Sequence, residues 1–207
     1  MRKWLLWLCF GWLLCGSCAA YATTWLVVGD SLSAAYGIEE EQGWVALLQQ
    51  RLAEEGHALR VVNASLSGDT TAGGHARLPA LLAEYEPSLT IIELGGNDGL
   101  RGLPIEQMEQ HLRGMIQLAR AANSEVLLLG MHIPPNYGQP YAAAFHQVYQ
   151  ALHQEEQVPL VAFLLENVGA VKGMMQEDGI HPTAEAQPMM LDNVWPQLLT
   201  ILQHKEE

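Results

Sequence analysis

The sequence Trp25-Leu26-Val27-Val28-Gly29-Asp30-Ser31-Leu32 contains the first apolar run after the amino-terminal segment and the turn that follows it. A short apolar run that is rich in branched residues and stops at a glycine predicts a buried strand. Gly29 allows the chain to turn tightly, and the residues after Ser31 can begin a helical turn. Ser31 would then stand at the carboxyl end of a strand, the edge at which open α/β sheets bind ligands. Because Gly-Asp-Ser also occurs in ordinary turns, a chemical role for Ser31 requires partners elsewhere in the chain.

The amino end has the pattern of a secretory signal. Arg2 and Lys3 precede an apolar run over residues 4–14, and Ala20-Tyr21-Ala22 supplies a small-x-small cleavage site. The run is too short to span a bilayer comfortably. We therefore expect a signal peptide at 1–22, cleavage after Ala22, a single domain over 23–207 and a periplasmic location without stable membrane insertion.

All three cysteines lie in this leader, at Cys9, Cys15 and Cys18. Lipid attachment at Cys18 is an alternative to simple cleavage, although Cys15 stands where a bacterial lipoprotein signal normally carries Leu. A chain cleaved after Ala22 has no cysteine. Disulfides, thiolate metal sites and a cysteine nucleophile are then excluded from the mature domain.

The net charge bears on the possible partners. It is −13 for the whole chain, and loss of the leader, which has two basic residues and no acid, makes it two units more negative. Such a surface repels nucleic acid and anionic membrane faces. We expect uncharged or amphipathic small substrates, no nucleic-acid partner and a monomer.

Strand and helix patterns alternate about five times along the chain. Besides the first strand, we expect strands at 59–64, 89–94, 125–130 and 160–163, and helices at 43–55, 74–85, 104–123, 141–157 and 183–203. This alternation predicts a three-layer α/β/α sandwich, flavodoxin-like, with a parallel sheet of about five strands. Pro196 is expected to kink or break the last helix, and the segment 165–176 has no clear pattern.

Polar and glycine-rich loops follow the strands, so residues far apart in sequence converge on one edge of the sheet. Ser31, a weak nucleophile alone, needs an adjacent base. His181 is the best candidate among the eight histidines, because Asp178, three residues before it, can accept its other ring N–H and fix its tautomer. We interpret the other seven histidines as core or solvated residues.

The same edge offers donors for an oxyanion. Gly68 permits close approach of its backbone N–H, Asn97 has a side-chain amide, and the backbone N–H of Ser31 is a third donor. Taken singly, Gly68 and Asn97 are common turn residues. Asp69 and Asp98 lie nearby, but no His or Glu at ligand spacing supports a metal site. We expect no metal and no cofactor, and interpret both aspartates as loop hydrogen-bonding residues.

Four segments together resemble the sequence blocks of the SGNH, or GDSL, hydrolase family, in the family's order and spacing. They are Gly29-Asp30-Ser31-Leu32, Ser67-Gly68-Asp69, Gly95-Gly96-Asn97-Asp98 and Asp178-Gly179-Ile180-His181-Pro182. The resemblance covers almost the whole chain after residue 22. It implies the SGNH fold, Ser31 as nucleophile, Gly68 and Asn97 as oxyanion donors, and a triad completed by Asp178 and His181. It also implies hydrolysis of acyl thioesters, carboxylic esters and lysophospholipids.

Substrate binding calls for an apolar wall beside these residues. The candidates flank the relevant loops and are Leu100, Leu103, Ile133, Pro134 and Tyr137. Residues 99–104 contain two glycines, Gly99 and Gly102, that permit hinge motion, so a mobile flap is one interpretation of this segment and a fixed surface loop is the alternative. Two alternatives to a lipid esterase stay open: a carbohydrate O-deacetylase of the same family, and a non-catalytic binding protein for fatty acids or lysolipids.

Overall fold

A single sheet of five parallel strands, in the order β2-β1-β3-β4-β5, forms the centre of the molecule. We describe it from a computed structural model that covers residues 23–204; the expected signal peptide and Cys18 lie outside these residues. The strands are β1 (Thr23–Gly29), β2 (Leu59–Asn63), β3 (Leu89–Glu93), β4 (Glu125–Leu129) and β5 (Leu160–Val161). After β2 the chain crosses back over β1, and β3 forms on the other side of β1, so the direction of strand addition reverses. This topology opens a crevice at the carboxyl ends of the strands.

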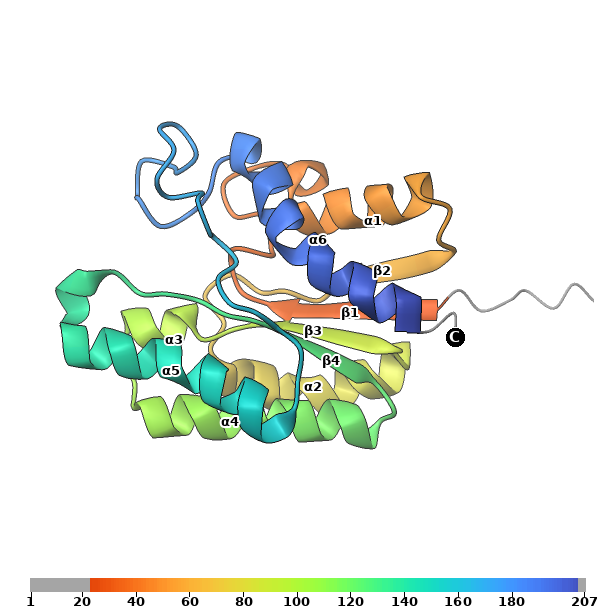
Figure 1. The fold of residues 1–207 in the computed structure, drawn as a ribbon, viewed down its shortest axis with the longest axis horizontal. Helices are drawn as coiled ribbons and strands as arrows, with labels where there is room; N and C mark the ends of the chain where they lie inside the picture. The colour runs from red at the N-terminus through yellow and green to blue at the C-terminus, as the bar shows by residue number, and fades with distance from the viewer. Residues whose placement is uncertain (1–22, 205–207) are drawn as a thin grey trace, which may run out of the picture.

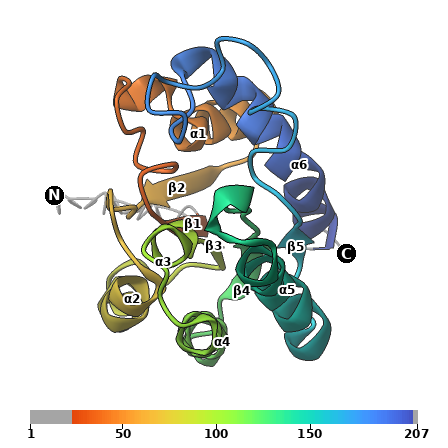
Figure 2. The ribbon, with the colours of Figure 1, turned by 90° about the vertical axis from the view of Figure 1, so that its left-hand side faces the viewer.

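Helices cover both faces of the sheet, as the alternating pattern predicts. They are α1 (Trp44–Glu54), α2 (Thr71–Tyr85), α3 (Gly96–Leu100), α4 (Ile105–Ala121), α5 (Gln139–Glu156) and α6 (Gln187–His204). Figures 1 and 2 show α1 and α6 on one face and α2, α4 and α5 on the other. The three-layer α/β/α architecture is therefore confirmed.

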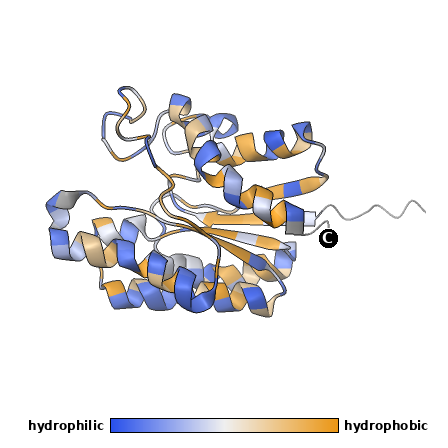
Figure 3. Cartoon of the chain, viewed as in Figure 1, coloured by the Kyte–Doolittle hydropathy of each residue, from blue (hydrophilic) through white to orange (hydrophobic). Residues whose placement is uncertain are grey.

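The core lies between these layers. All five residues of β3 are buried, and so are the last five residues of β1. Figure 3 shows hydrophobic residues concentrated on the strands, while the helices carry both hydrophobic and hydrophilic residues. Near-continuous apolar strands are expected in a parallel sheet that is covered on both faces. None of the helices within residues 23–204 has the length and hydrophobicity needed to span a bilayer.

The last helix differs from its prediction. A short 3-10 turn at Ala184–Ala186 precedes α6, which runs through Pro196 without a break. A proline costs the helix one hydrogen bond. The residues around it, Trp195 and Leu198, are buried in the core, and this packing holds the helix together across the proline.

Two further boundaries differ from the sequence prediction. The helix expected from residue 74 begins at Thr71, because the Thr70 hydroxyl accepts a hydrogen bond from the Gly73 backbone N–H and caps it. The short helix α3 forms in one of the polar, glycine-rich segments that the sequence predicts to be loops after the strands. Its first residue follows Gly95, whose φ of 122° permits the abrupt turn out of β3.

Candidate active site

The turn after β1 holds Ser31 at the carboxyl edge of the sheet. The Asp30 carboxylate accepts a hydrogen bond from the Leu32 backbone N–H at 3.1 Å, and the Asp30 carbonyl accepts one from Ala34 at 2.9 Å. Through these bonds Asp30 stabilises the turn. The backbone N–H of Ser31 donates no hydrogen bond to another residue of the range 23–204, so it stays available to a ligand.

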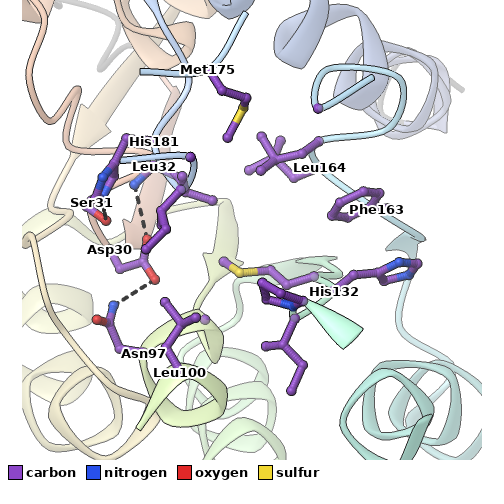
Figure 4. Close-up of a pocket in the computed structure, with 18 residues that line it drawn as sticks. Asp30, Ser31, Leu32, Asn97, Leu100, His132, Phe163, Leu164, Met175 and His181 are labelled. Carbon is purple, nitrogen blue, oxygen red and sulfur yellow. Dashed lines mark hydrogen bonds between the residues drawn. The ribbon is translucent and has the colours of Figure 1, made fainter. Parts of the chain in front are cut away.

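Ser31, His181 and Asp178 form a continuous line of hydrogen bonds. His181 Nε2 lies 2.9 Å from Ser31 Oγ, and His181 Nδ1 lies 2.6 Å from Asp178 Oδ2. Figure 4 shows Ser31 and His181 side by side at the wall of the pocket. With Nδ1 bonded to a carboxylate, the neutral imidazole carries its proton there and leaves Nε2 free to accept the serine proton.

Asp178 is itself fixed by its own loop. Its Oδ1 accepts hydrogen bonds from the backbone N–H groups of Ile180 and His181, at 2.9 and 3.0 Å. These bonds, that from the His181 backbone foremost, lower the pKa of Asp178 from 3.8 to about 2. Asp178 is therefore a carboxylate at neutral pH. The ring of Tyr36 packs on the other side of His181, with the ring centroids 4.4 Å apart.

Asn97 is oriented by a buried carboxylate. Its Nδ2 donates to Asp30 Oδ2 at 3.0 Å, and Figure 4 shows this bond beneath Ser31. A primary amide has two N–H groups, so one is left for a ligand. Burial raises the pKa of Asp30 from 3.8 to about 6, against the lowering effect of its bonds from Leu32 and Asn97. The sequence did not indicate this second role of Asp30.

Gly68 is held next to the end of β1. Its loop is tied to that strand by the Leu66 backbone N–H, which donates to the Gly29 carbonyl at 3.0 Å. Gly68 has a φ of +80°, which favours glycine. Its backbone N–H donates no hydrogen bond within the part of the chain that the structure covers, whereas its carbonyl accepts one from Arg101 at 2.8 Å.

A buried glutamate beneath the turn has no signal in the sequence. Glu93 Oε2, at the end of β3, accepts from the Asp30 backbone N–H at 3.2 Å and from the Ser33 hydroxyl at 2.6 Å. Burial and the neighbouring Asp30 raise the pKa of Glu93 well above its usual value. A Cβ on Gly29 would lie 2.5 Å from Glu93 Oε2, so this contact requires the glycine.

A largely apolar cleft of about 490 Å³ opens beside Ser31. Its lining residues come from loops that follow all of the strands except β2, and Figure 4 shows their side chains facing one another across the opening. The apolar members are Leu32, Leu100, Met131, Ile133, Pro134, Phe163, Leu164, Leu165, Met175 and Ile180. A cleft of this size and character suits an aliphatic chain of an ester.

The structure divides the predicted substrate residues. Leu100, Ile133 and Pro134 line the cleft, whereas Leu103 and Tyr137 do not. Each of these two lies further along its loop from the strand end, and its side chain is exposed. Met131, Phe163, Leu164 and Met175 were not anticipated. Most of them directly follow the ends of β4 and β5, and that position is the signal that could have identified them.

One of the other seven histidines lies in the cleft. His132 is exposed, which agrees with a solvated residue, and it also lines the cleft and stacks on Phe163 with ring centroids 4.3 Å apart. His146 meets it edge-on at 4.1 Å. The stack forms the wall of the cleft that faces Ser31 and His181 in Figure 4.

The expected flap at 99–104 is tied down at several points. Gly99 belongs to α3 and packs so closely that a Cβ there would lie 2.5 Å from Ile133 Cγ2; this glycine therefore serves packing. The Leu103 backbone donates to Asp98 at 3.0 Å and accepts from the Tyr141 hydroxyl at 2.8 Å. The mobility of this segment stays a prediction.

Asp69 and Asp98 make the structural bonds that were expected of them. Asp69 pairs with Arg77 at 2.8 Å, and Asp98 accepts from the backbone and the hydroxyl of Thr71, at 2.9 and 2.6 Å. Within residues 23–204 no three His, Asp or Glu side chains are grouped so that they could hold a metal ion.

Comparison with known proteins gives a consistent result. The chain is 59% identical to the esterase TesA of Pseudomonas aeruginosa over 98% of this chain and 100% of that one. It is 46% identical to the thioesterase 1/protease 1/lysophospholipase L1 of Escherichia coli, over 90% of this chain and 88% of the relative.

Solved structures agree with the sequence relatives. A crystal structure of TesA matches with a TM-score of 0.83 at 62% identity, over 85% of this chain and 98% of that one. The psychrotrophic esterase EstA from Pseudoalteromonas, inhibited by monoethylphosphonate, matches with a TM-score of 0.84 at 39% identity, over 87% and 99% of the two chains. The model of the GDSL-like lipase/acylhydrolase family matches residues 27–187. The chain belongs to this GDSL, or SGNH, family of hydrolases and is an enzyme of the esterase type.

Proposed function

We propose that the protein is a secreted serine hydrolase that cleaves acyl thioesters, carboxylic esters and lysophospholipids through an acyl-enzyme intermediate. The observation that carries the proposal is the hydrogen-bonded line from Ser31 through His181 to Asp178, at 2.9 and 2.6 Å. The apolar cleft beside Ser31 supports an acyl substrate. Relatives named esterase, thioesterase, lysophospholipase and arylesterase support the same range of substrates.

In the first step His181 Nε2 takes the proton of the Ser31 hydroxyl as Ser31 Oγ attacks the carbonyl carbon. Asp178 stabilises the imidazolium that forms. The tetrahedral oxyanion would be held by the backbone N–H groups of Ser31 and Gly68 and by the free N–H of Asn97. Loss of one such donor typically slows turnover by about 10²- to 10³-fold.

Collapse of this intermediate breaks the bond to the leaving alcohol or thiol, which takes the proton back from His181. The acyl group then stays on Ser31 Oγ. A water molecule gives its proton to His181 Nε2 and attacks the acyl carbon, and the carboxylic acid leaves as Ser31 recovers its proton. Every proton moves through the one imidazole, so this scheme needs no metal and no cofactor.

Secretion is proposed from the leader, with its basic residues Arg2 and Lys3 and the site at Ala22. Export would place the enzyme in the periplasm. We also propose that it is a monomer.

A rate panel tests the proposed activity. We expect purified protein to hydrolyse p-nitrophenyl butyrate, a medium-chain acyl-CoA and a lysophospholipid, and Ser31→Ala to lose all three activities. Higher kcat/KM for acetylated sugars than for any acyl ester would instead identify a carbohydrate deacetylase. Tight binding of fatty acid without turnover of any substrate would identify a binding protein.

A further inference from the structure

The large hydrophobic side chains that are exposed within residues 23–204 all lie on one side of the molecule. They are Tyr36, Leu66, Leu103, Tyr137, Val171 and Ile180. Each lies in a loop that follows the carboxyl end of a strand or the short helix after it. Figure 2, which looks onto this edge, shows these loops around the ends of the strands. Clustering of exposed apolar residues marks an interaction surface, whereas scattered ones are unremarkable.

Unpaired cations lie in the same loops. Among the basic residues that the structure covers, Arg51, Arg77, Arg113 and Arg120 make ion pairs with carboxylates. Arg101 binds only the Gly68 carbonyl, and Lys172 has no ion pair within the covered range. Arg101 is two residues from Leu103, and Lys172 adjoins Val171. A third cation without a carboxylate partner, Arg60, lies near the amino end of β2, at the opposite edge of the sheet.

Acidic groups complete the pattern. Glu39, Glu40 and Glu41 are exposed in the connection between β1 and α1, which lies on the same side, and Glu177 is exposed between Val171 and Ile180. The surface around the cleft thus combines apolar side chains with cations and anions. The phosphate of a zwitterionic phospholipid headgroup can bind the cations of this surface, and its ammonium group can bind the anions. A net charge of −13 disfavours an anionic membrane.

We propose that this surface, here called the catalytic rim (Leu66, Arg101, Leu103, Tyr137, Val171 and Lys172), docks the protein reversibly on zwitterionic phospholipid. The apolar side chains enter the headgroup region, and Arg101 and Lys172 bind phosphate. The mouth of the cleft then faces the lipid, so that acyl chains enter from the membrane without crossing water. The binding goes beyond the proposed function and does not require turnover.

A second copy of this chain is the other partner that an apolar surface suggests. Two copies joined at the catalytic rim would close each other's cleft, and they would bring two strongly acidic bodies together. Lipid avoids both costs. Light scattering distinguishes the two, because the proposal expects a monomer in the absence of lipid.

Cosedimentation with vesicles of dioleoyl phosphatidylcholine tests the proposal. The Ser31→Ala variant is used, so that binding is measured without hydrolysis. In that background Val171→Ser/Lys172→Glu removes one apolar contact and reverses one charge of the rim. Arg60→Glu is the matched control, since it reverses an exposed, carboxylate-free cation at the opposite edge. We expect about tenfold or greater weakening by the rim variant and no change with the control.

Failure of the Ser31→Ala protein to sediment with the vesicles would overturn the proposal, as would equal weakening by the two variants or a dimer that buries the rim. To check folding, the same substitutions are made in the enzyme that keeps Ser31, and hydrolysis of p-nitrophenyl butyrate by these variants is measured. We expect it to be unchanged. Activity on this soluble ester without vesicle binding would refute docking alone. Vesicle binding without esterase activity would refute the proposed function alone.

Discussion

Asn97 donates its side-chain amide to the buried carboxylate of Asp30 at 3.0 Å, and that carboxylate also accepts the Leu32 backbone N–H in the turn that carries Ser31. One side chain thus connects the nucleophile to an oxyanion donor on α3, the short helix that follows β3. The spacing between Ser31 Oγ and the Asn97 amide depends on both bonds.

Asp30→Asn tests this connection. An asparagine has one side-chain oxygen for two donors, so its NH2 group would face either Leu32 or Asn97. We expect kcat for p-nitrophenyl butyrate to fall by roughly 10²-fold because the Asn97 amide turns away. Asp192→Asn, at an exposed carboxylate that pairs with Arg51, is the control and should leave kcat unchanged. Equal kcat for Asp30→Asn and wild type would contradict the orienting role.

The same variant has a pH-dependent effect on stability. The pKa of Asp30 is raised from 3.8 to about 6, so the folded state binds this proton more tightly than the unfolded state. The resulting stabilisation is full below pH 3.8 and is lost as pH rises through about 6. Asparagine cannot ionise, and the destabilisation caused by Asp30→Asn should therefore be smaller at pH 8 than at pH 4, by up to about 3 kcal/mol. Urea unfolding at both pH values measures the difference; a larger destabilisation at pH 8 would show that Asp30 is stabilised as an anion.

Two variants of Glu93 test whether the turn after β1 needs an acceptor oxygen at this position or a negative charge. Glu93→Leu leaves the Asp30 backbone N–H and the Ser33 hydroxyl without their buried acceptor, which costs about 2–5 kcal/mol of unfolding free energy. Glu93→Gln keeps an acceptor oxygen, and because burial favours the uncharged acid at this site, we expect most of the stability and activity to return. Thermal unfolding and kcat are measured for both. If glutamine were as damaging as leucine, the negative charge and not the acceptor would be what the turn needs.

How far the sequence predicts this molecule depends on the range of the interactions involved. The strand before Ser31 and the spacing of Asp178 and His181 are local patterns, and the structure places all three side chains in one line. Parallel topology then brings the other loops to the same edge. The contact of Glu93, at the end of β3, with Ser33, in the turn after β1, joins residues 60 positions apart, and no local pattern contains it.

The cleft shows the same limit. Ile133 and Leu100 could be assigned from their position after a strand, whereas the stacking of His132 on Phe163 depends on how two loops pack. The side on which Leu103 and Tyr137 emerge is likewise decided by loop conformation. The continuity of α6 through Pro196 follows from burial, which overrides the local preference.

Phe163→Ala tests the role of the cleft wall. Removing the ring leaves an acyl chain with fewer apolar contacts, and each buried methylene contributes about 0.8 kcal/mol. We expect kcat/KM for p-nitrophenyl octanoate to fall about tenfold, with little change for the acetate, which does not reach the wall. Val171→Ala, outside the cleft, should affect neither ester. Equal losses on both esters would mean that Phe163 supports the site as a whole and does not bind the chain.

The nucleophilic role of Ser31 is tested most directly by labelling with a fluorophosphonate, followed by intact-mass measurement and peptide mapping. Ser33, two residues away, is the matched control because its hydroxyl is buried and donates to Glu93. The nucleophilic role of Ser31 predicts one adduct per chain, located on Ser31, absent from Ser31→Ala and retained in Ser33→Ala. A wild-type protein that stays unlabelled at neutral pH, or an adduct that persists in Ser31→Ala, would contradict it.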